Sequence, residues 1–174
     1  MKYFNNGFTL AELLAVVIIL AIMAAIAAGY YKRSVEQTRF SEGLMAASAI
    51  AEGVNREYLR TKMEGDLVPT KRPKLKSLDI AISKNASCNT SSAYCVKTKN
   101  FEVFVNSNGV TRAYRGTTNQ YKYYIEVQPH FAAASVRDRI ACVGSSSTGV
   151  SFKGKEFCQG LGYTSCSSNT CVKP

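Results

Sequence analysis

The sequence predicts an α+β fold, in which one long N-terminal α-helix packs on a small antiparallel β-sheet and a disulfide-bonded C-terminal region follows. Three observations lead to this prediction. No charged residue occurs from Leu13 to Tyr31, so the first half of the helix is apolar enough to cross a membrane. Segments between Phe101 and Val143 alternate apolar and polar residues, as half-buried strands do. All six cysteines lie in the second half of the chain.

The composition indicates a folded protein with a basic surface. Hydrophobic residues make up 46% of the 174 residues and charged residues 20%, which is not the balance of a disordered chain. The formal net charge is +10, which favours anionic partners such as a lipid surface or DNA. The positive residues are dispersed, apart from the group Lys71, Arg72, Lys74 and Lys76.

The apolar run near the N-terminus fits a conventional secretory signal poorly. Its alanines, from Ala21 to Ala28, continue the helical pattern, and no small-residue cleavage site follows in a turn. A plain membrane anchor would explain the length of the run and the basic boundary at Lys32-Arg33. It would not explain Glu12, because an ionised carboxylate within an apolar span costs at least a few kcal/mol and is usually functional.

The segment around Glu12 has a specific resemblance. The residues Gly7-Phe8-Thr9-Leu10-Ala11-Glu12-Leu13-Leu14, followed by the apolar run, resemble the N-terminal signal of type IV prepilins and type II secretion pseudopilins. The resemblance implies the pilin fold, cleavage after Gly7 by a prepilin peptidase, and N-methylation of the new first residue, Phe8. It also implies that Glu12 is the assembly glutamate of this family.

The position of Glu12 has a physical rationale in a filament. Cleavage would create a positive α-amine at Phe8, about one helical turn from Glu12. When helices stack side by side, Glu12 of one subunit can meet the Phe8 amine of a neighbour. Since an unpaired buried charge is strongly penalised, the pair would set the axial register of the subunits.

Small residues recur along the same helix. Ala21, Ala25 and Gly29 are spaced by four residues, as are Ala24 and Ala28, and such ridges allow close packing of helices in apolar surroundings. Simple abundance of alanine explains the pattern equally well. Many pilins have a proline where Gly29 stands, so any kink or melting of the helix here would depend on Gly29.

The helix is predicted to continue beyond the membrane as an amphipathic segment. Its apolar face holds Leu44, Ala47, Ala51, Val54 and Tyr58, and its polar face holds Arg39, Glu42, Glu52, Arg56 and Arg60. Gly65, Pro69 and Pro73 end it near Met63. The expected parts of the chain are a leader peptide (1–7), a transmembrane and filament-core helix (8–31), the amphipathic half of that helix (32–63) and a globular head (64–174).

Three parts are expected within the head: a connecting loop (64–100), an antiparallel sheet (101–143) and a Cys-rich tail (144–174). Three or four strands are predicted in the sheet: 101–105, 110–115, 121–128 and 139–143. Asn108-Gly109 is the expected turn between the first two strands.

The cysteines favour disulfides formed in an oxidising compartment. Zinc is the weaker alternative, because no C-x-x-C pair occurs and His130 is the only histidine. A preference for short loops predicts the pairs Cys88–Cys95, Cys142–Cys158 and Cys166–Cys171, although six cysteines allow fifteen pairings. A stapled tail of this kind resembles the C-terminal disulfide loop of pilins in position.

The leading functional hypothesis is a pilin that polymerises into a type IV pilus-like filament for adhesion, twitching motility or DNA uptake. The alternatives are a pseudopilin of a type II secretion system and a membrane-anchored binding protein that never polymerises. No catalytic constellation, metal site or cofactor motif is recognised, so an enzyme is the least favoured class. The resemblance implies as partners other copies of the chain, the prepilin peptidase, the assembly platform with its ATPase, and the inner membrane, from which the subunit moves into a surface filament.

Overall fold

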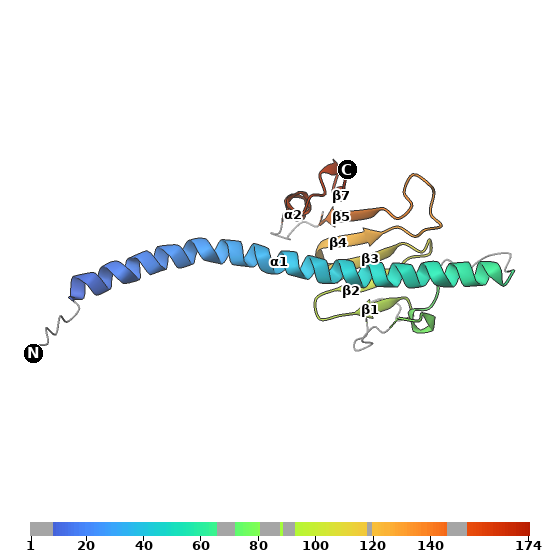
Figure 1. The fold of residues 1–174 in the computed structure, drawn as a ribbon, viewed down its shortest axis with the longest axis horizontal. Helices are drawn as coiled ribbons and strands as arrows, with labels where there is room; N and C mark the ends of the chain where they lie inside the picture. Colours follow the sequence, from blue (N-terminus) through green and yellow to red (C-terminus); the bar gives the residue numbers. More distant parts are fainter. Residues whose placement is uncertain (1–8, 66–71, 81–87, 89–92, 118–119, 146–152) are drawn as a thin grey trace, which may run out of the picture. The chain divides into compact units, whose positions relative to one another are not determined.

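A computed structural model describes residues 9–65, 72–80, 88, 93–117, 120–145 and 153–174. Two compact units, Met1–Thr38 and Arg39–Pro174, make up the chain. The elements follow in the order α1 (Leu10–Met63), η1 (Leu75–Ser77), β1 (Cys95–Lys97), β2 (Glu102–Val105), β3 (Thr111–Gly116), β4 (Tyr121–Val127), β5 (Ile140–Gly144), α2 (Gly154–Gly160), β6 (Ser165–Ser167) and β7 (Thr170–Val172) (Figure 1).

The charged residues in its end turns and the glycine that follows it account for where the long helix α1 begins and ends. Glu12 lies in its first turn and Arg60 and Lys62 lie in its last turn, which suits the helix dipole. Helix α1 stops at Met63 and is followed by Gly65, whose φ of 86° is in the left-handed region that ends helices. The helix continues without a break through Gly29, so the structure has no melted segment there.

The first unit exposes its apolar side chains. From Leu10 to Ile26 the large hydrophobic residues are all about half exposed or more, and Leu10 is 85% exposed. Within the described residues, α1 is the helix whose length and composition would allow it to cross a membrane. An apolar surface of this extent needs lipid or other apolar helices around it.

In the second unit, the part of α1 from Arg39 onward packs one face on the sheet. Ala47, Ala51 and Val54 of the predicted apolar face are buried, and Leu44 and Tyr58 lie at its half-buried margins. The same face also contributes the buried Phe40 and Ile50. Opposite them in the core are the sheet residues Val103, Val105, Ala113, Tyr123, Ile125 and Cys142. The predicted packing of an amphipathic helix on an antiparallel sheet is confirmed.

The sheet is wider than the sequence predicts. It has seven antiparallel strands in the order β1-β2-β3-β4-β5-β7-β6. The four predicted strands correspond to β2, β3, β4 and β5, and the turn between β2 and β3 has Gly109 at a φ of 79°. Strand β1 falls in the segment expected to be a loop, and β6 and β7 fall in the expected tail. Each of these strands has three residues, which is too few to show an alternating pattern in the sequence. They form because a neighbouring strand supplies hydrogen-bond partners.

Gly43 and Gly53 of α1 are both buried against the rest of the fold, but alanine is expected to change stability in opposite directions at the two positions. A Cβ at Gly43 would lie 2.6 Å from two ring atoms of Phe101, whereas a Cβ at Gly53 would meet its nearest atom at 3.4 Å, in ordinary contact. We expect Gly43→Ala to destabilise the head by about 1–2 kcal/mol, because overpacking outweighs the gain in helix propensity. Gly53→Ala should instead stabilise it by up to about 1 kcal/mol. Denaturant unfolding of the full chain in detergent measures both, and equal effects would contradict the packing argument.

Candidate functional site

The first turn of α1 forms a closed hydrogen-bond arrangement between Thr9 and Glu12. The backbone N–H of Thr9 donates to Oε2 of Glu12 at 2.8 Å, and the Thr9 hydroxyl donates to the same oxygen at 2.8 Å. In return, the N–H of Glu12 donates to Oγ1 of Thr9 at 3.3 Å. This is a capping box, in which a threonine before the helix and a glutamate three residues later satisfy backbone donors at the helix start.

The capping box gives the Glu12 carboxylate a partner within its own chain. The T-x-x-E spacing of Thr9 and Glu12 is visible in the sequence before an apolar run, but Glu12 was interpreted only as a partner for a neighbouring subunit and not as part of a helix cap. Because the carboxylate accepts two hydrogen bonds from Thr9, its presence beside an apolar helix costs less than that of a bare charge. Its second oxygen, Oε1, receives no hydrogen bond from Thr9, so the carboxylate can still accept another donor.

The predicted cleavage residues lie outside the described part of the chain. Gly7 and Phe8 precede Thr9, where the description begins. The cleavage after Gly7, the methylation of Phe8 and the meeting of Phe8 with Glu12 of a neighbour therefore stay predictions.

A comparison with protein families identifies the N-terminal segment. Residues 4–28 match the family model described as the prokaryotic N-terminal methylation motif. The chain carries a prepilin-type signal. No solved structure matches the chain.

The match covers residues 4–28 of the 174, and it supports a precursor of the pilin or pseudopilin type. The prepilin-type signal is one of structural subunits and not of enzymes, and it implies processing by a prepilin peptidase. The matched residues contain both the predicted cleavage junction Gly7-Phe8 and the Thr9–Glu12 capping box. The long apolar helix is in keeping with a precursor held in a membrane.

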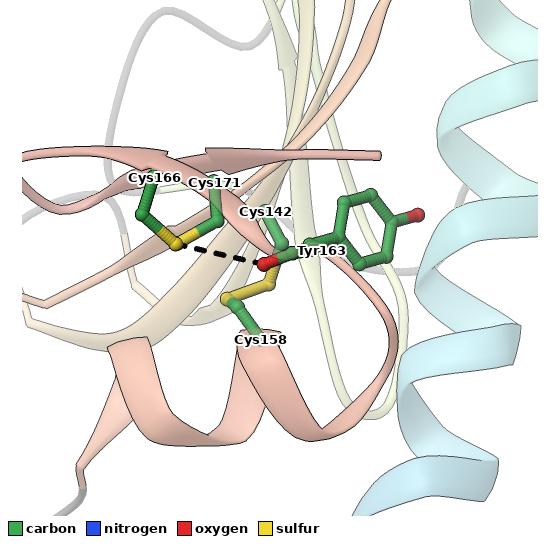
Figure 2. Close-up of a disulfide and its surroundings, with 5 residues drawn as sticks. All are labelled: Cys142, Cys158, Tyr163, Cys166 and Cys171. Carbon is green, nitrogen blue, oxygen red and sulfur yellow. Dashed lines mark hydrogen bonds between the residues drawn. A yellow bond between two sulfur atoms is a disulfide. The ribbon is translucent and has the colours of Figure 1, made fainter. Parts of the chain in front are cut away.

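Disulfides hold the head together, and all six cysteines are paired. The pairs are Cys88–Cys95, Cys142–Cys158 and Cys166–Cys171, which are the pairs expected from the sequence. Cys142–Cys158 joins β5 to α2 and is fully buried. Cys166–Cys171 closes the hairpin of β6 and β7, and Figure 2 shows it close to the Cys142–Cys158 bridge.

The segment between the second and third disulfides is anchored by aromatic packing. The Tyr163 ring projects from the loop after α2 towards α1 in Figure 2, and its centroid lies 5.7 Å from that of Phe40. Phe157 of α2 stacks on Tyr123 of β4 with a centroid distance of 4.9 Å. These contacts attach the Ser/Gly-rich tail to the core, which it could not form by itself.

The tyrosines of β3 and β4 pack on one another. Tyr114, Tyr121 and Tyr124 make ring contacts with centroids 5.0–5.4 Å apart, and Tyr123 is fully buried in the core. Burial raises the pKa of Tyr124 to about 12. The cluster is therefore a packed part of the sheet, in which Tyr114 is buried and Tyr121 and Tyr124 are half-buried.

Proposed function

We propose that this chain is the precursor of a structural subunit that polymerises into a type IV pilus-like filament. Residues 1–7 would be the leader peptide removed after Gly7, and Phe8 would become the N-methylated first residue. Residues 8–31 would form the membrane helix and later the filament core, 32–63 the amphipathic half of the same helix, and 64–174 the head exposed on the filament.

One observation supports this proposal most directly. The first part of α1 is apolar on all sides and exposed, yet it starts with a carboxylate held by a capping box. A simple anchor needs the apolar surface, but its helix start could be capped by an uncharged side chain. A helix that leaves the lipid and packs among identical helices can use the charge of Glu12 to recognise the amine of a neighbouring subunit.

The head supports the same proposal from the other end of the chain. Three disulfides and a seven-stranded sheet stabilise a small domain that would face the medium outside the cell. The partners of the proposed subunit are other copies of itself, the prepilin peptidase, the inner membrane before assembly, and the assembly platform with its ATPase. A pilus is favoured over a secretion pseudopilus because this stapled head suits a long-lived exposed surface.

Processing provides the first test of the proposed function. We expect the mature chain to begin with N-methylated Phe8 and to have lost Lys2, which lowers the side-chain net charge by one from the +10 of the precursor. Mass spectrometry of the N-terminal peptide measures both changes. A Gly7→Leu variant should keep its leader, because the motif implies a peptidase that cuts after this glycine. An intact Met1 in the wild-type chain, or a cut near Ala28, would contradict the proposal.

Imaging then separates the filament subunit from its alternatives. Fibres sheared from the cell surface should contain the processed chain along their length. A pseudopilin would be processed in the same way but would not build long surface fibres at its natural level. A membrane-anchored binding protein would stay in the membrane fraction.

A further inference from the structure

Three cysteines lie side by side on neighbouring strands at one side of the sheet. Cys142 of β5 is opposite Cys171 of β7, and Cys171 is opposite Cys166 of β6. Directly opposite residues of antiparallel strands point to the same face of the sheet. Cys171 therefore lies between two cysteines, although it is bonded to only one of them.

The register places Cys171 within bonding range of Cys142 as well as Cys166. Opposite residues in antiparallel strands have Cα atoms about 4.5–5.5 Å apart. Disulfides form at Cα separations of about 4.4–6.8 Å, so a Cys142–Cys171 bond needs no large movement of the backbone. The existing Cys142–Cys158 bond spans a comparable 5.7 Å between Cα atoms.

The fourth cysteine, Cys158, lies near this row of cysteines, because Tyr163 contacts both Cys158 and Cys166. The N–H of Tyr163 donates to the carbonyl oxygen of Cys158 at 3.2 Å. The carbonyl oxygen of Tyr163 lies 3.5 Å from the sulfur of Cys166, as Figure 2 shows. Cys158 and Cys166 are thus next to the same residue, one on each side of it.

The four cysteines differ in exposure to solvent. Cys142, Cys158 and Cys171 are fully buried, whereas Cys166 is partly exposed. Disulfide exchange requires a thiolate to reach a sulfur, so an external thiol would attack this group at Cys166.

We propose that Cys142, Cys158, Cys166 and Cys171 form a thiol–disulfide exchange site, with Cys166 as its entry point for an external thiol such as a C-x-x-C oxidoreductase. The external thiolate bonds to Cys166, and the Cys166–Cys171 bond breaks with its electron pair left on Cys171. The Cys171 thiolate then attacks Cys142, forming Cys142–Cys171 and releasing the thiolate of Cys158. Attack by Cys158 on the mixed disulfide at Cys166 forms Cys158–Cys166 and returns the external thiol, so no net oxidation or reduction occurs.

This site would allow a buried bond to be formed or corrected after the head has folded. A thiol oxidoreductase cannot contact Cys142–Cys158 directly, because both sulfurs lack exposed surface. Through Cys171, an external thiol could change the pairing of all four cysteines by reacting at one partly exposed residue, Cys166. The Cys88–Cys95 bond lies at the opposite edge of the sheet, where β1 is the edge strand, and takes no part in this exchange.

Two single variants test the proposal, because both lose the same disulfide but leave different thiols. Each full chain is produced in an oxidising compartment, isolated in detergent, alkylated under native conditions and mapped as non-reduced peptides. In Cys166→Ser the free thiol is Cys171, so we expect a Cys142–Cys171 cross-link together with alkylated Cys158. In Cys171→Ser the free thiol is Cys166, which lies near Cys158 and is not opposite Cys142. Any exchange in this variant should therefore give Cys158–Cys166 with alkylated Cys142, and no Cys142–Cys166 link should form.

Two outcomes of this comparison would overturn the proposal. One is a Cys166→Ser chain in which Cys142–Cys158 is intact and Cys171 is the only alkylated cysteine. The other is a Cys142–Cys166 link in the Cys171→Ser chain, because a bond between cysteines that are not opposite each other would indicate general loosening of the tail. If neither variant accumulates, the wild-type chain decides the question after incubation with a trace of glutathione and trapping in acid. Peptides linking Cys142 to Cys171 would then support the exchange site, and their absence would overturn it.

Discussion

Replacing Glu12 with leucine is expected to leave normal amounts of processed protein in the membrane but few or no filaments. In the membrane the change removes a charge that costs at least a few kcal/mol in an apolar span, so insertion should not suffer. In a filament it removes the proposed partner of the neighbouring Phe8 amine. Loss of one partner from a buried ion pair costs about 3–5 kcal/mol, and each added subunit would incur this cost. Immunoblots of processed chain and electron microscopy of sheared fibres measure the two effects.

The capping box makes a sharper control available for this experiment. Glu12→Gln keeps an oxygen that accepts hydrogen bonds from Thr9 but removes the charge. Thr9→Ala keeps the charge but removes the hydroxyl, at a cost of about 0.5–2 kcal/mol to the helix start. If charge pairing controls assembly, Glu12→Gln should lose filaments and Thr9→Ala should largely keep them. If Thr9→Ala loses filaments and Glu12→Gln keeps them, Glu12 acts through the helix cap. Abundant normal fibres from Glu12→Leu would refute any role of Glu12 in assembly.

Removal of the Cys142–Cys158 bond is expected to have the largest effect on the stability of the head. The bond closes a loop with a sequence separation of 16, and loop-closure entropy predicts a loss of about 3 kcal/mol in the free energy of unfolding. Alanine is the suitable replacement at both positions, because both side chains are fully buried and serine would add unpaired hydroxyls there. Denaturant unfolding of the full chain in detergent, or its resistance to brief proteolysis, measures the loss.

The Cys88–Cys95 pair provides the matched control for this double replacement. Its sequence separation is 7, so the same relation predicts a loss of about 2.4 kcal/mol. It also joins the edge strand β1 to the preceding connection, whereas Cys142–Cys158 fixes α2 to the centre of the core. An equal or greater loss from the Cys88 and Cys95 double variant would show that core placement does not determine the effect.

Local patterns in the sequence determined the long helix and the central strands. The apolar run, the three- and four-residue spacing up to Tyr58 and the stop at Gly65 each reflect the conformation of neighbouring residues, so α1 could be predicted from them. The two-residue alternation did the same for β2 to β5. The N-terminal motif is also contiguous, which is why the prepilin-type signal was recognised from residues alone. Its capping box was equally local, but its spacing was not interpreted.

Contacts between distant residues decided what the sequence could not show. Strands β1, β6 and β7 are too short to carry a pattern and form because an adjacent strand supplies hydrogen-bond partners. The close fit of Gly43 under Phe101 depends on residues far apart in the chain. The row of Cys142, Cys171 and Cys166 likewise exists only through strand register. A sequence restricts which cysteines can pair by loop length, but only the sheet places a third sulfur beside a bonded pair.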